Sequence, residues 1–294
     1  MLRAAAEAAG AQQYPAGALY VVATPIGNLA DLSLRAVHVL ALADAVACED
    51  KRHSAPLLRH LGLDKPLLAV HQHNERDASA GVLARLARGE RVAYVSDAGT
   101  PAVSDPGAVL VAAVRDAGFR VLPIPGASAA LAALSVAGDA RATAFRIAGF
   151  LPVKAGERAH ALAALLAQDD AQVLFEAPHR IESLCRALAA GCPERSVTLC
   201  RELTKQFETV VTLRAVELAG WIAGDPNRLR GEFVLVLHAP AATPAAVRDH
   251  DATLLPLLEA LPLKQAVALA AKLTGAQRNA LYERALALKA LPPG

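Results

Sequence analysis

The chain has 294 residues, of which 54% are hydrophobic and 20% are charged, and its formal net charge is +2. A chain of this length is long for one hydrophobic core and suits two or more domains. No stretch is apolar over the roughly 18 residues that a membrane-spanning helix needs, and the N-terminus lacks the basic start and apolar run of a secretion signal. We therefore expect a cytoplasmic protein with no membrane span, in which residues 1–17 form a disordered tail.

The first half of the chain alternates short apolar runs with amphipathic helical patterns. The expected strands cover residues 19–23, 45–48, 67–70, 92–95 and 120–124. Short strands that alternate with helices form βαβ units and a parallel sheet. We expect Asp31 or Ser33 to cap the first connecting helix and Ser54 to cap the second. Residues 18–140 are thus predicted to form one α/β domain.

Strand patterns continue after residue 140 but change in kind. The expected strands there are 145–149, 173–175, 197–199, 209–213 and 233–237. The last two suit antiparallel pairing, so a mixed sheet is predicted. We assign residues 141–239 to this second α/β domain.

The end of the chain is short and basic. Residues 240–261 are predicted to form a linker and a helix, and residues 262–294 two helices around a glycine turn, as in a helix-turn-helix. Residues 262–294 hold five basic residues and one acidic residue, which gives +4 and leaves −2 for the rest of the chain. A basic module suggests a polyanionic partner. A dimerisation or packing hairpin would fit this segment equally well.

The loop 95–107 is the most informative segment. It holds two glycines, two prolines and two aspartates, and it follows the expected strand 92–95. Ligands of open α/β sheets bind at the carboxyl ends of strands, and glycine lets the backbone approach a ligand closely. The motifs of dinucleotide, nucleoside-triphosphate, zinc-protease and serine-hydrolase sites are absent. The loops therefore predict an adenosine-sized ligand that is held mainly by backbone.

The four cysteines show no metal-ligand spacing. We expect no zinc site, and no other metal site is indicated. Disulfides are not expected either.

Seven short motifs follow one another in order along residues 22–205. They are VATPIGNL (22–29), EDKR (49–52), SDAGTP (96–101), PIPGAS (123–128), GFLP (149–152), EAPHRI (176–181) and RELTK (201–205). With these motifs the chain closely resembles the bacterial ribosomal RNA small subunit methyltransferase I family. That family belongs to the tetrapyrrole-methylase (class III) methyltransferase superfamily. The resemblance spans roughly residues 18–238, and the C-terminal pair of helices also fits it.

The resemblance implies a homodimer with two α/β domains of the tetrapyrrole-methylase type. It also implies S-adenosylmethionine as cofactor and the ribose 2′-hydroxyl of a cytidine in the decoding region of small-subunit rRNA as acceptor. By position, the residues expected to bind the cofactor are Pro25, Gly27, Asp97, Ala98, Gly99, Thr100, Val103, Ser128, Ala129 and Glu176. Many tetrapyrrole methylases carry an acid where this chain has Thr100. Whether Asp97 or Asp105 holds the amino end of the methionine therefore stays open.

Methyl transfer to a hydroxyl needs an aligned acceptor oxygen and a group that takes its proton, and it needs no metal. The candidate proton acceptors are Glu49, Asp50, Lys154, Glu202 and Lys205. The adjacent pair Glu49 and Asp50 is the first choice, because neighbouring carboxylates raise each other's pKa. Alternatively, this pair merely anchors Arg52 and a helix start. The catalytic residues are thus predicted to be Glu49, Asp50 and Lys154, and the RNA-binding residues Arg52, His179, Arg180, Lys205, Lys272 and Arg278.

Two other functions stay open at this point. One is methylation of a small tetrapyrrole-like substrate with the same cofactor, and the other is a non-catalytic role in rRNA binding and assembly. A tetrapyrrole substrate would not need the EDKR loop or the basic C-terminal segment. A vestigial pocket would tolerate bulky substitutions, yet the loop 98–101 holds none.

Overall fold

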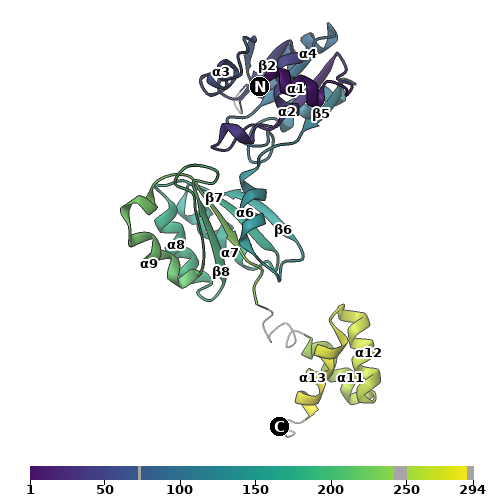
Figure 1. Cartoon of the computed structure of the whole chain (residues 1–294). Coiled ribbons are helices and arrows are strands. Elements are labelled where there is room, and N and C mark those ends of the chain that lie inside the picture. Colours follow the sequence, from purple (N-terminus) through teal and green to yellow (C-terminus); the bar gives the residue numbers. More distant parts are fainter. Residues whose placement is uncertain (72–73, 242–249, 290–294) are drawn as a thin grey trace. The chain divides into compact units, whose positions relative to one another are not determined.

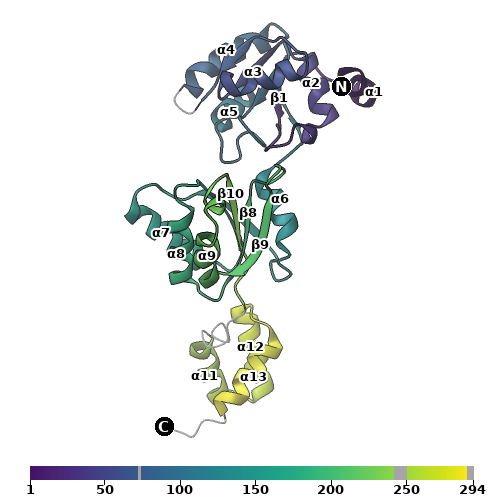
Figure 2. The same ribbon diagram turned by 60° about the vertical axis from the view of Figure 1, so that its left-hand side comes forward.

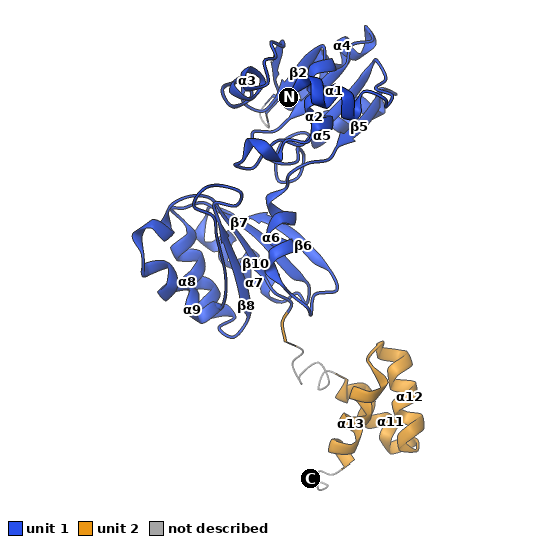
Figure 3. Ribbon diagram, viewed as in Figure 1, with its two compact units in different colours: residues 1–239 blue, residues 240–294 orange. Residues whose placement is uncertain are grey.

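The computed structural model describes residues 1–71, 74–241 and 250–289. The chain divides into two compact units, Met1–Ala239 and Pro240–Gly294 (Figure 3). The division falls at the end of the second expected α/β domain. No helix in the described part of the chain has the length and apolar character to cross a membrane.

The first sheet of the larger unit is wholly parallel, with strand order β3-β2-β4-β1-β5. Its strands are β1 (Ala18–Val22), β2 (Ala45–Cys48), β3 (Leu67–Ala69), β4 (Val92–Val95) and β5 (Arg120–Ile124). Its helices are α2 (Leu34–Leu42), α3 (Lys51–His60), α4 (Glu75–Ala87) and α5 (Ala108–Asp116). Successive strand side chains point to opposite faces, so Tyr20 packs with α2 and α3 while Leu19 packs with α4 and α5. The sheet is therefore covered on both faces, as predicted for a parallel sheet.

The N-terminal segment is not a disordered tail over its first residues. Residues Leu2–Ala9 form α1, which packs against α2 and buries Ala5 and Ala9. Alanine is the best helix former, and its small side chain lets two helices approach closely. The expectation of a disordered tail is therefore wrong for these residues.

One of the two expected helix caps is also wrong. Oγ of Ser33 accepts from the backbone N of Ala36 at 3.1 Å and caps α2 as expected. Helix α3, however, is capped by Asp50, whose Oδ1 accepts from the backbone N of Arg52 at 2.8 Å. Ser54 lies buried inside that helix. Both residues are good caps, and the helix begins at the earlier one.

The second sheet of the larger unit is mixed, with strand order β6-β7-β10-β8-β9. Strands β6 and β7 are parallel, and the other neighbours are antiparallel. The strands are β6 (Phe145–Phe150), β7 (Ala171–Glu176), β8 (Ser196–Arg201), β9 (Thr209–Arg214) and β10 (Phe233–Leu237). The mixed character predicted from the sequence is confirmed.

Helices cover both faces of this second sheet (Figures 1 and 2). One face packs against α7 (Ala155–Leu166), α8 (Ile181–Gly191) and α9 (Ala215–Ala223). The other face packs against the alanines of α6 (Ala129–Ala137). Two short 3₁₀ helices, η1 (Leu29–Asp31) and η2 (Pro226–Leu229), complete the unit. Because α6 follows β5 of the first sheet, it brings the chain from one sheet to the other.

The smaller unit is a bundle of α11 (Asp251–Ala260), α12 (Leu263–Thr274) and α13 (Arg278–Lys289). Leu254, Val267 and Leu281 form its core with other apolar side chains. Gly275 ends α12 in the left-handed region with a φ of +73°, as C-terminal glycines do. Residues 242–249 of the expected linker and 290–294 of the expected basic module lie outside the described residues.

Candidate functional site

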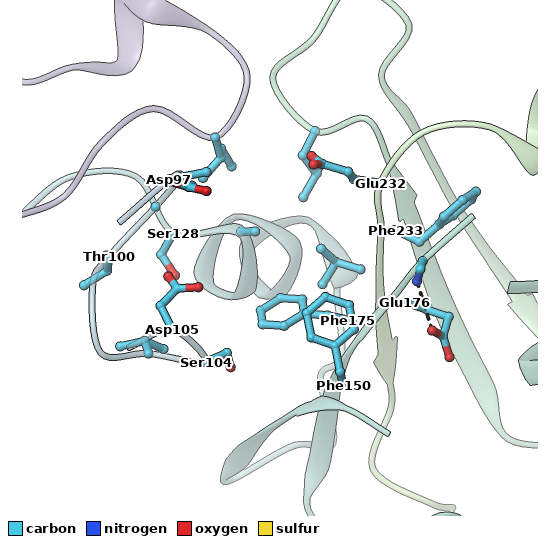
Figure 4. Close-up of a pocket in the computed structure, with 18 of the residues that line it drawn as sticks. Asp97, Thr100, Ser104, Asp105, Ser128, Phe150, Phe175, Glu176, Glu232 and Phe233 are labelled. Atoms are coloured by element: carbon cyan, nitrogen blue, oxygen red, sulfur yellow. Dashed lines mark hydrogen bonds between the residues drawn. The ribbon is translucent and has the colours of Figure 1, made fainter. Parts of the chain in front are cut away.

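A cavity of about 520 Å³ lies at the carboxyl ends of strands of the first sheet and is also lined by the second sheet (Figure 4). The first sheet contributes Ile26, Glu49, residues of the loop 97–105 and the start of α6 at Ser128 and Ala129. The second contributes Phe150, Phe175, Glu176, Ala177, Pro178, Leu203, Glu232, Phe233 and Val234. The volume lies in the range of small-molecule sites.

The loop that follows β4 has a constrained backbone at this cavity. Gly99 exchanges two backbone hydrogen bonds with Thr24, at 2.8 and 3.0 Å, and its φ is +76°. Ala102 and Ser104 also have left-handed φ values, +64° and +66°, although neither is glycine. Oγ1 of Thr100 donates to the carbonyl of Ala127 at 3.1 Å, which ties the loop to the start of α6. Strained positions of this kind gather at ligand sites.

The charged residues that line the cavity are all acidic. Among the described lining residues they are Glu49, Asp97, Asp105, Glu176 and Glu232. Burial, with Asp97 and Asp105 nearby, raises the pKa of the Glu49 carboxyl, and burial likewise raises the pKa of Asp105. A cation in the cavity would relieve this repulsion. The electrostatics therefore suit a ligand that carries positive charge.

Glu176 supplies a buried acceptor. Its side chain is fully buried, its Oε1 accepts from the backbone N of Ala177 at 2.9 Å, and Nε of Arg180 lies 3.1 Å from the same oxygen. Its Oε2 is buried and has no hydrogen-bond partner in the described structure. Buried polar atoms are nearly always paired, so this oxygen is an unused acceptor, which a bound molecule can reach only if the wall around the 0%-exposed side chain opens.

The structure brings most of the predicted cofactor residues together. Eight of the ten line the main cavity: Asp97, Ala98, Gly99, Thr100, Val103, Ser128, Ala129 and Glu176. The other two, Pro25 and Gly27, line a neighbouring cavity. Sequence reasoning missed Phe150 and Phe175, whose ring centroids are 5.6 Å apart. Their position at the ends of β6 and β7 was the available signal.

The neighbouring cavity has a volume of about 280 Å³ and lies within the part of the larger unit built on the first sheet. The loop after β1, helix α3 and the start of the loop after β4 form its walls. Asp97 lines both cavities. Its Oδ1 accepts from the backbone N of Asp50 at 3.1 Å, and its Oδ2 lies 2.8 Å from Nδ1 of His53. Sequence reasoning also missed His53, although it directly follows the EDKR loop.

Of the three predicted catalytic residues, only Glu49 lines the main cavity. Asp50 caps α3 and forms an ion pair with Arg52 at 2.5 Å, and this hydrogen-bonded pair lowers the pKa of Asp50 to about 2. Lys154 lines neither cavity, and its side chain is 82% exposed, with Nζ 3.2 Å from Oε1 of Glu157. Asp50 is therefore a weak base, and Lys154 lies outside the lining of both cavities.

The predicted RNA contacts fall into two groups. Arg52, His179, Lys272 and Arg278 are exposed. Arg180 is not: its side chain is 14% exposed, its Nη2 donates to the carbonyl of Leu151 at 2.7 Å, and its Nε lies beside Glu176. This placement contradicts the expected phosphate contact of Arg180, because the guanidinium holds the cavity wall. Nζ of Lys205 is 2.9 Å from both Glu202 and Glu232, so its charge is already balanced.

Comparisons with known proteins identify the family of this chain. Residues 18–219 match the family model of the Tetrapyrrole (Corrin/Porphyrin) Methylases, and residues 244–289 match the RsmI C-terminal HTH domain. Ribosomal RNA small subunit methyltransferase I of Pseudomonas aeruginosa is 46% identical over 275 residues, which cover 92% of this chain and 97% of that protein. The protein of the same name from Neisseria meningitidis serogroup A is 47% identical over 280 residues, 93% and 94% of the two chains. The chain belongs to the ribosomal RNA small subunit methyltransferase I family.

Solved structures place this family member on the tetrapyrrole-methylase fold. A uroporphyrin-III-C-methyltransferase from Thermus thermophilus matches with a TM-score of 0.55 at 25% identity, over 76% of this chain and 94% of that one. The methyltransferase CobJ matches with a TM-score of 0.58 at 20% identity, over 76% and 94%. The resemblance drawn from the seven sequence motifs and the α/β fold class are both confirmed.

Proposed function

We propose that the protein transfers a methyl group from S-adenosylmethionine to the 2′-hydroxyl of a cytidine in the decoding region of small-subunit (16S) ribosomal RNA. The observation that carries the proposal is the acid-lined cavity in a chain whose curated relatives are named ribosomal RNA small subunit methyltransferases. The choice of a cytidine, of its 2′-hydroxyl and of the decoding region rests on the sequence resemblance. The S-adenosylmethionine donor is supported by the cavity itself.

The residues of the cavity fit the donor's chemistry. S-adenosylmethionine brings an activated methyl group on a positively charged sulfonium, together with a positively charged amino group. The carboxylates of Glu49, Asp97 and Asp105 stabilise such charges. The rings of Phe150 and Phe175 offer apolar and cation–π surface. A structure of the Thermus thermophilus uroporphyrin-III C-methyltransferase is described as complexed with S-adenosyl homocysteine, at 18% identity and a TM-score of 0.53.

The exposed basic residues suit the RNA. Lys272 and Arg278 are exposed on the smaller unit, and Arg52 is 88% exposed, although its charge is paired with Asp50 at 2.5 Å. Contacts of such residues with phosphates give a salt-dependent affinity with little sequence reading. A substrate that is part of the ribosome is compatible with a cytoplasmic protein. The resemblance also supports a homodimer, for which light scattering should give twice the 30.5 kDa of one chain.

A transfer assay with two acceptors tests this proposal. Purified enzyme is incubated with methyl-labelled S-adenosylmethionine and either small ribosomal subunits from a strain that lacks the gene or a tetrapyrrole precursor. We expect label in the ribosomal RNA alone. Label in the tetrapyrrole would assign the protein to the small-molecule methylases. Tight donor binding without any transfer would instead indicate a non-catalytic assembly factor.

A further inference from the structure

We propose that the neighbouring cavity receives the nucleoside that accepts the methyl group, and that His53 is the catalytic residue that removes the proton of its 2′-hydroxyl. Asp97 acts as the positioning residue for His53. The inference rests on the proposed function, and it names the acceptor subsite and the proton acceptor of that reaction.

The two cavities meet at one side chain. Asp97 lines both of them, and its two oxygens bind the backbone N of Asp50 at 3.1 Å and Nδ1 of His53 at 2.8 Å. The main cavity carries the carboxylates that suit a cationic donor, whereas the neighbouring cavity is lined by two histidines and by Pro25, Leu29 and Leu57. A neutral, partly apolar nucleoside suits the lining of the neighbouring cavity better than the acidic lining of the main cavity. The acceptor would therefore lie next to the donor, with Asp97 between the two sites.

The contact with Asp97 determines which nitrogen of His53 is basic. An ionised carboxylate only accepts hydrogen bonds, so Nδ1 of the neutral imidazole carries the hydrogen and Nε2 keeps its lone pair. Nε2 has no hydrogen-bond partner in the described part of the chain. A basic imidazole nitrogen whose ring is oriented by a carboxylate is a common arrangement for taking the proton of a hydroxyl group. His53 thus offers one free basic nitrogen in a fixed ring orientation.

The side chain of His53 is 63% exposed, so a proton taken from the substrate has a route to solvent. The acceptor oxygen forms a bond to the methyl carbon as the carbon–sulfur bond breaks, and the electron pair of that bond stays on sulfur. The hydroxyl proton passes to Nε2, and the imidazolium is held by the carboxylate of Asp97 until it releases its proton to water. The products are the methyl ether, the neutral thioether and one proton.

The other titratable groups near His53 are less suited to this step. Asp50 already forms an ion pair with Arg52 and caps the start of α3. Glu49 lines only the main cavity, where its pKa is raised by burial and by Asp97 and Asp105. A bound cation would lower that pKa again and weaken Glu49 as a base. His60 lines the neighbouring cavity on the same helix, but no carboxylate in the described part of the chain contacts it and orients its ring.

The variant His53→Asn tests the assignment. The Asn amide keeps a donor for Asp97 but has no basic nitrogen. We expect kcat to fall about 100-fold or more, the range of general-base catalysis, while the Kd of S-adenosylmethionine stays within two-fold of wild type. The acid limb of the pH profile of kcat should disappear. His160→Asn, an exposed histidine of α7 that lines neither cavity, is the matched control and should match wild type.

Three more variants separate catalysis from folding. Asp97→Asn should lower kcat, and combining it with His53→Asn should add little, because the two residues act as a unit. In His53→Ala, added imidazole should restore part of the lost activity, which a purely structural role would not allow. Wild-type kcat or an unchanged acid limb in His53→Asn would overturn the inference alone. A wild-type enzyme that binds donor but labels no RNA would overturn the proposed function and the inference with it.

Discussion

Glu176→Gln is the substitution that probes the donor cavity most cleanly. The wild-type carboxylate is fully buried, and one oxygen is already occupied by the backbone N of Ala177 and by Arg180. The other oxygen, Oε2, is buried without a partner. Gln keeps the shape of the side chain and the first acceptor, but its amide nitrogen cannot accept a hydrogen bond from a ligand.

The size of the effect follows from that single oxygen. A hydrogen bond to a charged, buried acceptor contributes about 1.5–3 kcal/mol. Losing it should weaken donor binding by about 10- to 150-fold. The same factor should apply to S-adenosylmethionine and to S-adenosylhomocysteine, because both carry the same hydroxyl and amino groups and differ only at sulfur. The fold should survive, since Arg180 keeps its bond to the carbonyl of Leu151.

Isothermal titration calorimetry with both ligands measures this prediction. The control is Glu182→Gln on α8, which removes an exposed carboxylate paired with Arg186 and should change neither affinity. Affinities of Glu176→Gln within two-fold of wild type would refute the role of Oε2. Weakened binding of S-adenosylmethionine alone would show that Glu176 acts through its charge instead.

Three further sets of substitutions test other parts of the structure. Glu49→Gln should weaken S-adenosylmethionine about ten-fold and S-adenosylhomocysteine less than two-fold, because it removes one charge near the sulfonium. The raised pKa of Glu49 means that the folded state binds this proton more tightly than the unfolded state, so stability falls as pH rises. The unliganded variant should therefore melt above wild type at pH 7, with the difference shrinking towards pH ~4. Gly107→Ala adds a Cβ that collides with the ring of Tyr94, at a φ of +128°, and should cost about 1–3 kcal/mol in urea unfolding. The control Gly81→Ala, whose Cβ would lie in open space, should stabilise by up to about 1 kcal/mol. Changing Lys272 and Arg278 to Ala should lower the salt dependence of RNA binding by about 0.7 in log–log slope per charge, with donor affinity unchanged.

Local sequence patterns located most of the elements. The strands expected at 45–48, 92–95, 120–124 and 233–237 have the same bounds in the structure. The loop after β4 was located because glycine, proline and aspartate directly after a buried strand are typical of a ligand-binding loop. Helix α1 was missed although its segment is amphipathic, because the burial of Ala5 and Ala9 depends on contact with α2.

Those local patterns could not predict contacts between residues that are distant in the sequence. His53 and Asp97 are 44 positions apart and meet only because β2 and β4 are neighbours in the sheet. Arg180 stood out as a basic residue at a helix start, yet its partner Glu176 belongs to the cavity wall. A sequence shows that a charge is present, but only the packed structure shows whether that charge is already neutralised.

The central claim, methylation of a ribose hydroxyl in small-subunit RNA, has one direct measurement. Small subunits from a strain lacking the gene are methylated with labelled S-adenosylmethionine, and their RNA is then hydrolysed with alkali. A methylated 2′-oxygen cannot attack the adjacent phosphate, so the label should appear in one alkali-resistant dinucleotide whose first residue is a cytidine of the decoding region. Label released as a mononucleotide would place the methyl group on a base and contradict the account.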